Sequence, residues 1–256
     1  MIIKNLHFSG CSFVAGTSLR LSTKEGGKMT NDEKMSKNFH TLLSKKLNVP
    51  NVNIGSPGGS NKKAIRLVFD KVRNSNVEGT LFILGLSELY RTEKFSTHVN
   101  RIIKWRYETV FKHNEKIAMN QSLIPMSNDF HTKMDKEGHT DRIIDYAKTE
   151  FLFFKDREYE FNKLVQNLHT INAYIESKGA KLIIFSAMCD IIDPSKLEGL
   201  NFVEFPDGSL QYGSLQWRGY IKSYDPVYRG AHPSVDDQPK LTNILFKYIN
   251  ELGYEY

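Results

Sequence analysis

The sequence has few cysteines and no long apolar run. Its two cysteines, Cys11 and Cys189, cannot build the disulfide framework on which small secreted domains depend. The longest apolar runs, such as 81–86 and 182–185, are far shorter than the roughly 20 residues that a membrane-spanning helix needs. The N-terminal sequence MIIKNLHFSG lacks the apolar core and the cleavage site of a secretory signal. We therefore expect a cytoplasmic protein that does not act in a membrane.

Patterns that would hold a metal or a nucleotide are also missing. His131, Asp135, Glu137 and His139 lie near one another in the sequence, but they lack zinc-ligand spacing and a cysteine. The glycine-rich stretch 53–59 is not followed by the Lys-Ser/Thr pair of a phosphate-binding loop. The sequence therefore predicts no metal and no cofactor.

The charge excess is small. The chain has 35 basic and 29 acidic residues, a formal net charge of +6. Basic residues are scattered among acidic ones, as in 133–142, and this mixing favours a solvated surface over a nucleic-acid-binding face. We do not expect nucleic acid as a partner.

Short apolar segments alternate with amphipathic ones along most of the chain. Amphipathic segments predict helices that separate the strands and follow the last of them. One helix is expected after the capping box of Thr30 and Glu33, one over 61–73, one from residue 151 to Gly179, and one at the C-terminus. A hairpin is expected over 202–212. The apolar segments predict strands over 2–8, 49–54, 80–86 and 181–187. This alternation is typical of a three-layer α/β/α sandwich with a central parallel sheet.

Residues 92–150 break this rhythm. They are rich in His, Lys, Asn and Asp, with apolar clusters around 102–107. We interpret them as a helical insertion, of two or three helices, within a single domain that spans residues 1–256.

Small and polar residues follow the predicted strands. They occur in FSGCSF (8–13) after the first strand, NIGSPGGSN (53–61) after the second and GLSEL (85–89) after the third, and RGAHP (229–233) precedes the last helix. Each alone is typical of a turn. Together they are more informative, because the carboxyl ends of parallel strands line the ligand crevice of such sheets.

These four segments resemble the motif blocks of the SGNH (GDSL-like) hydrolase superfamily, in a divergent branch common in phage and bacterial genomes. Ser12 matches the nucleophile of the first block, with Cys11 in place of the family's Asp. Gly58 matches the glycine of the second block. The resemblance implies a flavodoxin-like sheet and a serine hydrolase; a phage-encoded member would work in the host cytoplasm or the virion.

The resemblance also implies a catalytic base and its orienting acid. A serine hydroxyl needs a base within hydrogen-bond reach, and His232 stands at the family's histidine position. The family places an acid three residues earlier, where this chain has Arg229. Asp225, seven residues before His232, could orient the base instead, or a backbone carbonyl could do so in a Ser–His dyad. Asp236 and Asp237 are more simply interpreted as caps of the last helix.

Acyl transfer requires donors for the developing oxyanion. The resemblance assigns this role to the backbone N–H groups of Ser12 and Gly58. The family's third donor is an asparagine, and Ser87 stands in its place. The Ser87 hydroxyl could donate, or Asn61 could supply the amide; Asn61 could equally be a helix cap.

The favoured function is therefore a serine ester hydrolase, acting on a small O-acyl group of a polar substrate such as a carbohydrate. Ser87 and Arg229 depart from the family pattern, so an alternative stays open. In it, the chain is a binding or structural protein of the same fold without catalytic activity. Trp105 and Tyr107 in the insertion suggest one wall of a sugar site. The insertion could instead make contacts between identical copies in a homo-oligomer.

Overall fold

The structure is a computed structural model. It describes residues 1–16, 30–57, 59–87, 89, 92–96, 101–108, 122–125, 156–187, 189, 191–205 and 235–256. Among these residues, no helix is both long enough and apolar enough to cross a bilayer. Both cysteines are buried free thiols, as expected for small apolar core residues.

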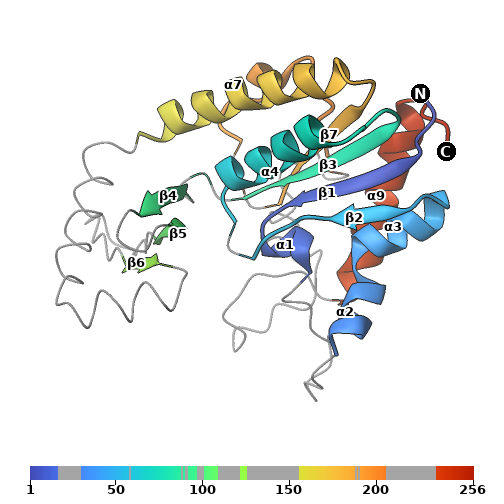
Figure 1. The fold of residues 1–256 in the computed structure, drawn as a ribbon, viewed down its shortest axis with the longest axis horizontal. Coiled ribbons are helices and arrows are strands. Elements are labelled where there is room, and N and C mark those ends of the chain that lie inside the picture. The colour runs from blue at the N-terminus through green and yellow to red at the C-terminus, as the bar shows by residue number, and fades with distance from the viewer. Residues whose placement is uncertain are drawn as a thin grey trace.

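Four parallel strands form the central sheet in the order β2-β1-β3-β7 (Figure 1). Their bounds are β1 Asn5–Gly10, β2 Asn51–Asn53, β3 Thr80–Leu86 and β7 Lys181–Ser186. After β2 the chain passes back over β1 to reach β3, so the strand order reverses at the boundary between β1 and β3. All seven residues of β3 are buried, as its uninterrupted apolar sequence predicts.

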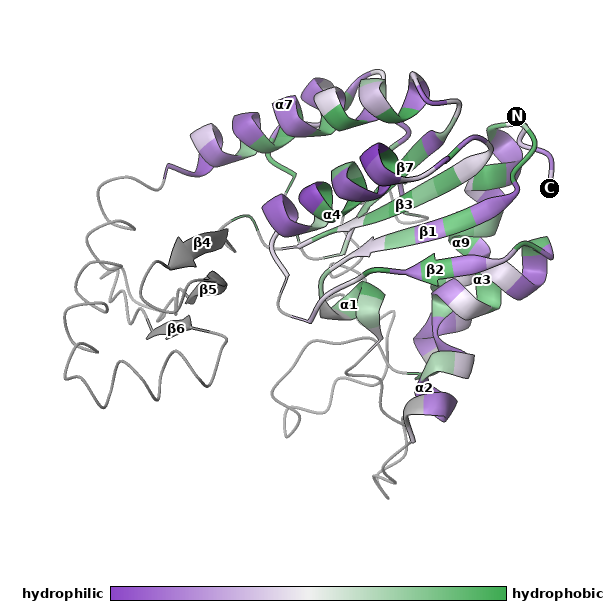
Figure 2. Ribbon diagram, in the orientation of Figure 1, coloured by the Kyte–Doolittle hydropathy of each residue, from purple (hydrophilic) through white to green (hydrophobic). Residues whose placement is uncertain are grey.

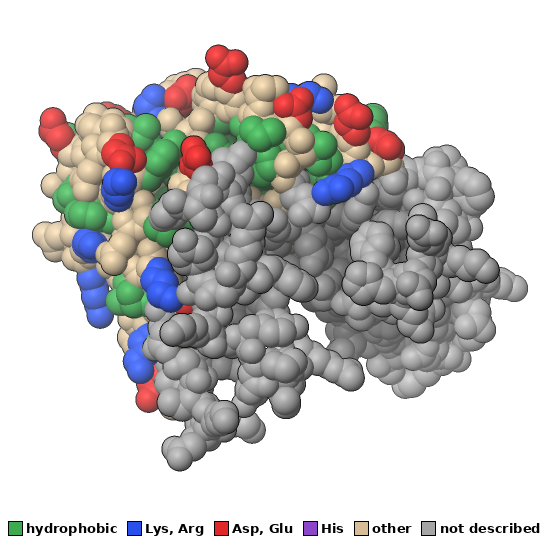
Figure 3. All heavy atoms as spheres, turned by 180° about the vertical axis from the view of Figure 1, so that it is seen from behind, with side chains coloured by type: hydrophobic (Ala, Val, Ile, Leu, Met, Phe, Trp, Pro, Cys, Tyr) green, Lys and Arg blue, Asp and Glu red, His purple; other side chains and the backbone are tan. Residues whose placement is uncertain are grey.

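Helices cover both faces of this sheet, which confirms the predicted three-layer α/β/α sandwich (Figure 1). The helices α3 (Phe39–Leu47) and α9 (Gln238–Glu251) pack on one face, and α4 (Asn61–Asn74) and α7 (Arg157–Glu176) pack on the other. Figure 2 shows mostly hydrophobic residues along β3 and a mixture of hydrophobic and hydrophilic residues along the helices. In Figure 3, side chains of both charge signs are present on the described part of the opposite face.

The first predicted helix is two helices. Its capping box is present, since Thr30 Oγ1 accepts from Glu33 N and the Glu33 carboxylate accepts from Thr30 N. However, α2 (Asn31–Lys37) ends at Asn38, and α3 begins after it. Asn38 is extended, and its side chain accepts a bond from His40 N, which starts a new helix instead of continuing the old one.

The insertion contains strands where the sequence analysis predicted helices. The strands β4 (Thr92–Ser96), β5 (Arg101–Glu108) and β6 (Ser122–Pro125) form an antiparallel sheet. At these positions the prediction of a helical insertion is wrong. The missed signal is the alternation in β5, where Ile103, Trp105 and Tyr107 alternate with charged residues; this period of two favours a strand.

The remaining elements are short. The 3₁₀ helix η1 spans Pro194–Leu197, and η2, Val235–Asp237, leads into α9. Phe202 forms a parallel bridge with Ile184, so the chain there runs alongside β7. The rest of the predicted hairpin, 206–212, lies outside the described residues.

Two buried histidines make the core sensitive to acid. The side chain of His7 on β1 packs on Phe82, and that of His40 on α3 packs on Phe8. Burial lowers the pKa of each imidazole to about 4; the charge of Lys71 adds to this for His7, and a hydrogen bond with Asn51 opposes it for His40. Among the described residues, His7 Nδ1 and His40 Nε2 have no hydrogen-bond partner.

We predict that the free energy of unfolding falls when the pH is lowered from 7 to 5. The pKa of each histidine is lower in the folded chain than in the unfolded one, so the unfolded chain binds more protons between pH 6.5 and 4. The loss should be about 2 kcal/mol per histidine, measured by urea unfolding. His40→Gln should remove about half of this pH dependence. Equal stability of the wild type at both pH values would contradict the prediction.

Candidate active site

The site begins where two glycines lie side by side at the ends of β1 and β3. Gly10 pairs with Gly85 in the sheet, and the short helix α1 (Ser12–Ala15) follows Gly10 after one residue. A Cβ atom on Gly10 would lie 2.5 Å from Val14 Cγ2, and one on Gly85 would lie 2.6 Å from the same atom. Only glycine at both positions therefore allows Val14 to pack on the strand ends and α1 to sit directly on the sheet.

Ser12 is the first residue of α1. Its backbone therefore lies at the carboxyl end of β1, beside the boundary where the strand order reverses. In open α/β sheets this boundary is the usual place of the ligand crevice. Gly10 of β1 pairs with Gly85 of β3. Ser12 follows Gly10 by two residues and Ser87 follows Gly85 by two residues, so the chain leaves both strands at the same level of the sheet.

The loop after β2 is bound to the end of β1. Ser56 N donates to Gly10 O at 2.8 Å, and Gly59 N donates to Ser56 O at 2.8 Å. The chain therefore reverses direction between Ser56 and Gly59. Gly58 itself lies outside the described residues.

Asn53 joins the end of β2 to α1. Its Nδ2 donates to Val14 O at 2.8 Å, and its Oδ1 accepts from Gly55 N at 2.8 Å. A Cβ on Gly55 would lie 2.8 Å from Ala15 N, so the loop and α1 are in close contact. We did not predict this role for Asn53 from the sequence. Its signal there is an asparagine two residues before a glycine, a spacing typical of a side-chain-stabilised turn.

Asn61 and Ser87 form a second side-chain bridge. Ser87 N donates to Asn61 Oδ1 at 2.6 Å, and Asn61 Nδ2 donates to Ser87 O at 3.0 Å. Both residues are buried, and Ser87 Oγ has no hydrogen-bond partner within the described ranges. Ser60, not Asn61, caps α4, because Ser60 Oγ accepts from Lys63 N. The amide of Asn61 is therefore occupied by the backbone of Ser87.

Three of the predicted site residues thus lie at the carboxyl edge of the sheet: Ser12, Asn61 and Ser87. The other three, Gly58, Asp225 and His232, lie outside the described residues, and their roles stay predictions. Within the described ranges, no group of three or more His, Cys, Asp or Glu side chains could hold a metal ion.

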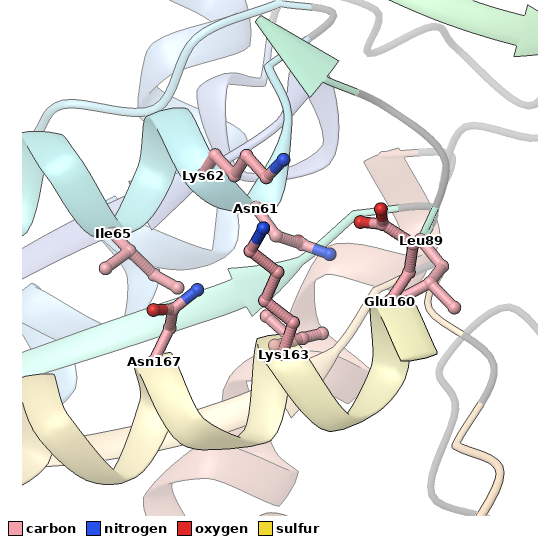
Figure 4. Close-up of a pocket in the computed structure, with 8 residues that line it drawn as sticks. Asn61, Lys62, Ile65, Leu89, Glu160, Lys163 and Asn167 are labelled. Atoms are coloured by element: carbon pink, nitrogen blue, oxygen red, sulfur yellow. The ribbon is translucent and has the colours of Figure 1, made fainter. Parts of the chain in front are cut away.

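A small pocket lies between α4 and α7 beside Asn61 (Figure 4). Its volume of about 20 Å³ is enough for about one water molecule. In Figure 4, the Lys163 side chain extends from α7 towards α4, and Leu89 lies close to Glu160. The chain that leaves β3 and the chain that enters α7 therefore lie near each other. The lining residues are Asn61, Lys62, Ile65, Leu89, Glu160, Lys163, Leu164 and Asn167.

We predict that Gly85→Ala destabilises the protein by about 1–3 kcal/mol in urea unfolding, as overpacked cores do. The added Cβ would lie 2.6 Å from Val14 Cγ2 and 2.8 Å from Phe185 Cζ. Val14→Ala removes the first of these contacts. The double variant should therefore lose less stability than the sum of the two single losses. If the stability loss of the double variant equals the sum of the two single losses, Val14 does not pack on residue 85.

No protein-family model and no curated protein matches the sequence. Among solved structures, the chain is similar to the psychrotrophic esterase EstA from Pseudoalteromonas sp., with 10% identity over 97% of this chain and 98% of that one and a TM-score of 0.47. It is similar to a lipolytic protein of the G-D-S-L family from Veillonella parvula, with 11% identity, 95% and 97% coverage and a TM-score of 0.43.

A third similar structure is the acetyl xylan esterase Est2A from Butyrivibrio proteoclasticus, with 12% identity over 99% of this chain and 65% of that one and a TM-score of 0.46. One of the three similar structures is a G-D-S-L family protein, and the identities of all three lie between 10% and 12%.

Proposed function

We propose that this chain is a serine ester hydrolase of the SGNH type, with Ser12 as its nucleophile. The observation that carries the proposal is the position of Ser12 at the start of α1, at the β1/β3 boundary and level with Ser87. A serine at a sharp strand-to-helix turn, at the ligand edge of a parallel sheet, is suited to attack a bound carbonyl.

In the proposed reaction, Ser12 Oγ attacks the ester carbonyl while His232 takes the hydroxyl proton. His232 then gives this proton to the leaving alcohol, and an acyl group remains on Ser12. Water attacks the acyl-enzyme with His232 again as base, which releases the acid and restores the serine. Asp225 orients the imidazole and stabilises its charged form.

The donors proposed for the oxyanion are the N–H groups of Ser12 and Gly58 and the hydroxyl of Ser87. Two observations support this set. Ser56 N donates to Gly10 O at the end of β1, and Gly59 N donates to Ser56 O, so the residues before and after Gly58 are tied to that end. The Ser87 hydroxyl is buried at the same edge and has no hydrogen-bond partner in the described part of the chain. A buried donor fixed in place before reaction stabilises charge better than mobile water does.

A fluorophosphonate, which reacts with activated serines, tests this proposal. We expect the reagent to label Ser12, as read by mass spectrometry of peptides, and Ser12→Ala to abolish both labelling and hydrolysis of p-nitrophenyl acetate. His232→Ala should reduce both strongly, and Asp225→Asn less so. Ser9→Ala is a matched control, because Ser9 lies three residues away and its hydroxyl donates to Ala64 O.

Absence of labelling in the folded wild-type protein would instead favour the second candidate, a binding or structural protein that has lost chemistry. The residues that favour it are Ser87 in place of the family's asparagine and Arg229 in place of its acid. Labelling at another residue would refute Ser12 as the nucleophile, and Cys11 would be the next to test.

The proposed substrate is a small O-acyl ester of a polar molecule such as a carbohydrate, with the insertion as one wall of its site. The strand β4 contacts α4, whose first residue is Asn61. The insertion therefore approaches the helix that begins at the site. Its sequence supplies Trp105 and Tyr107, whose flat apolar rings are suited to sugar rings, together with many polar groups.

We predict that replacing residues 92–150 by a short Gly-Ser linker changes substrate choice. A short linker can join the two ends because Leu89 and Glu160 line the same pocket. The variant should still hydrolyse p-nitrophenyl acetate but lose kcat/KM for an acetylated xylo-oligosaccharide. If both activities persist while the mass in solution changes, the insertion is an assembly element, and the substrate proposal for it is wrong.

A further inference from the structure

Both polar atoms of the Asn61 side-chain amide form hydrogen bonds with the backbone of a single residue, Ser87. The carbonyl oxygen accepts from Ser87 N at 2.6 Å, and the amide nitrogen donates to Ser87 O at 3.0 Å. Asn61 is 5% exposed and Ser87 1% exposed, so water competes little with either bond. The two bonds fix the backbone of Ser87 from both sides.

Both partners of this bridge lie at the end of a helix or strand. Asn61 is the first residue of α4, which Ser60 caps, and Lys63 Nζ reaches back from the same turn to Ser56 Oγ at 2.8 Å. Ser87 directly follows β3, and Ala187 N donates to Leu86 O at 3.0 Å beside it. The bridge therefore ties the loop after β2 to the end of β3.

The bridge leaves one polar group of Ser87 unused. The backbone N–H and C=O of Ser87 are both bonded to Asn61, while Ser87 Oγ is buried and has no partner among the residues that the structure describes. A buried hydroxyl without a hydrogen bond destabilises a fold, because the loss of its hydration is not offset. Natural proteins keep few such groups, and one at a ligand edge is explained if a bound substrate supplies the missing partner.

We propose that Asn61 is a positioning residue that acts through Ser87 and does not itself donate to the oxyanion. By holding the backbone of Ser87, it keeps the neighbouring hydroxyl aimed at the substrate oxygen. Without the bridge, residue 87 can rotate and its hydroxyl can turn to a backbone acceptor. This proposal rests on the proposed function and resolves the two roles that the sequence leaves open for Asn61.

The test compares Asn61→Ala, Ser87→Ala and the double variant with the wild type. The measurements are kcat and KM for p-nitrophenyl acetate, the rate constant for fluorophosphonate labelling of Ser12, and the melting temperature. Asn61→Ser is the second variant should Asn61→Ala fail to fold, because its shorter side chain cannot make both bonds. Asn201→Ala is the matched control: Asn201 Nδ2 donates to Leu182 O at 3.1 Å, at the opposite end of β7 from the site.

We expect Ser87→Ala to lower kcat about 100-fold with little change in KM, because the bond to the oxyanion forms only in the transition state. Asn61→Ala should lower kcat and the labelling rate to a similar extent. The double variant should be no slower than the slower single variant, because the two residues act as one unit. Asn201→Ala should lower the melting temperature and leave kcat unchanged.

Three outcomes would overturn the proposal. If wild-type Ser12 is labelled and Asn61→Ala is labelled equally fast, Asn61 has no positioning role, although the proposed function stands. If the losses from Asn61→Ala and Ser87→Ala multiply in the double variant, the two residues act independently. If the wild type is neither labelled nor active, the proposed function fails and the positioning role fails with it.

Discussion

The arrangement of the site depends on the close approach of α1 to the sheet, which the paired glycines Gly10 and Gly85 permit. Any side chain at either position would meet Val14 at a distance that packed atoms do not adopt. With α1 seated there, Ser12 stands at the reversal point of the strand order. Asn53 then donates a hydrogen bond to the backbone of α1, and Ser56 N donates to Gly10 O. The loop after β2 is therefore held against the contact between α1 and the sheet.

Two asparagines have the same structural role on either side of the contact between α1 and the sheet. Asn53 links the end of β2 to α1, and Asn61 links the start of α4 to the end of β3. Each uses a side-chain amide to satisfy backbone groups of an irregular loop, which would otherwise need water. The consequence is a set of loops whose backbone groups are fixed before any substrate arrives, which is the condition for stabilising a developing charge.

Local patterns in the sequence predicted most of the sandwich. The apolar run of β3 and the helical stripe of α7, with Phe161, Leu168 and Ile175 buried, lie where the residue periods place them. Predictions failed where a side chain competes with the backbone or where partners are distant. Asn38 divides one expected helix into two through a bond to its neighbour. The bridge from Asn61 to Ser87 spans 26 residues and leaves no periodic trace in the sequence.

We propose Ser12 as the nucleophile of a site whose donors come from the ends of β1, β2 and β3. A crystal structure of the protein after reaction with a fluorophosphonate tests this proposal. We expect phosphorus bonded to Ser12 Oγ, with its oxygen about 2.7–3.1 Å from Ser12 N, Gly58 N and Ser87 Oγ. We also expect His232 within hydrogen-bond reach of Ser12. A phosphonate on another residue, or one whose oxygen faces away from Ser87, would contradict it.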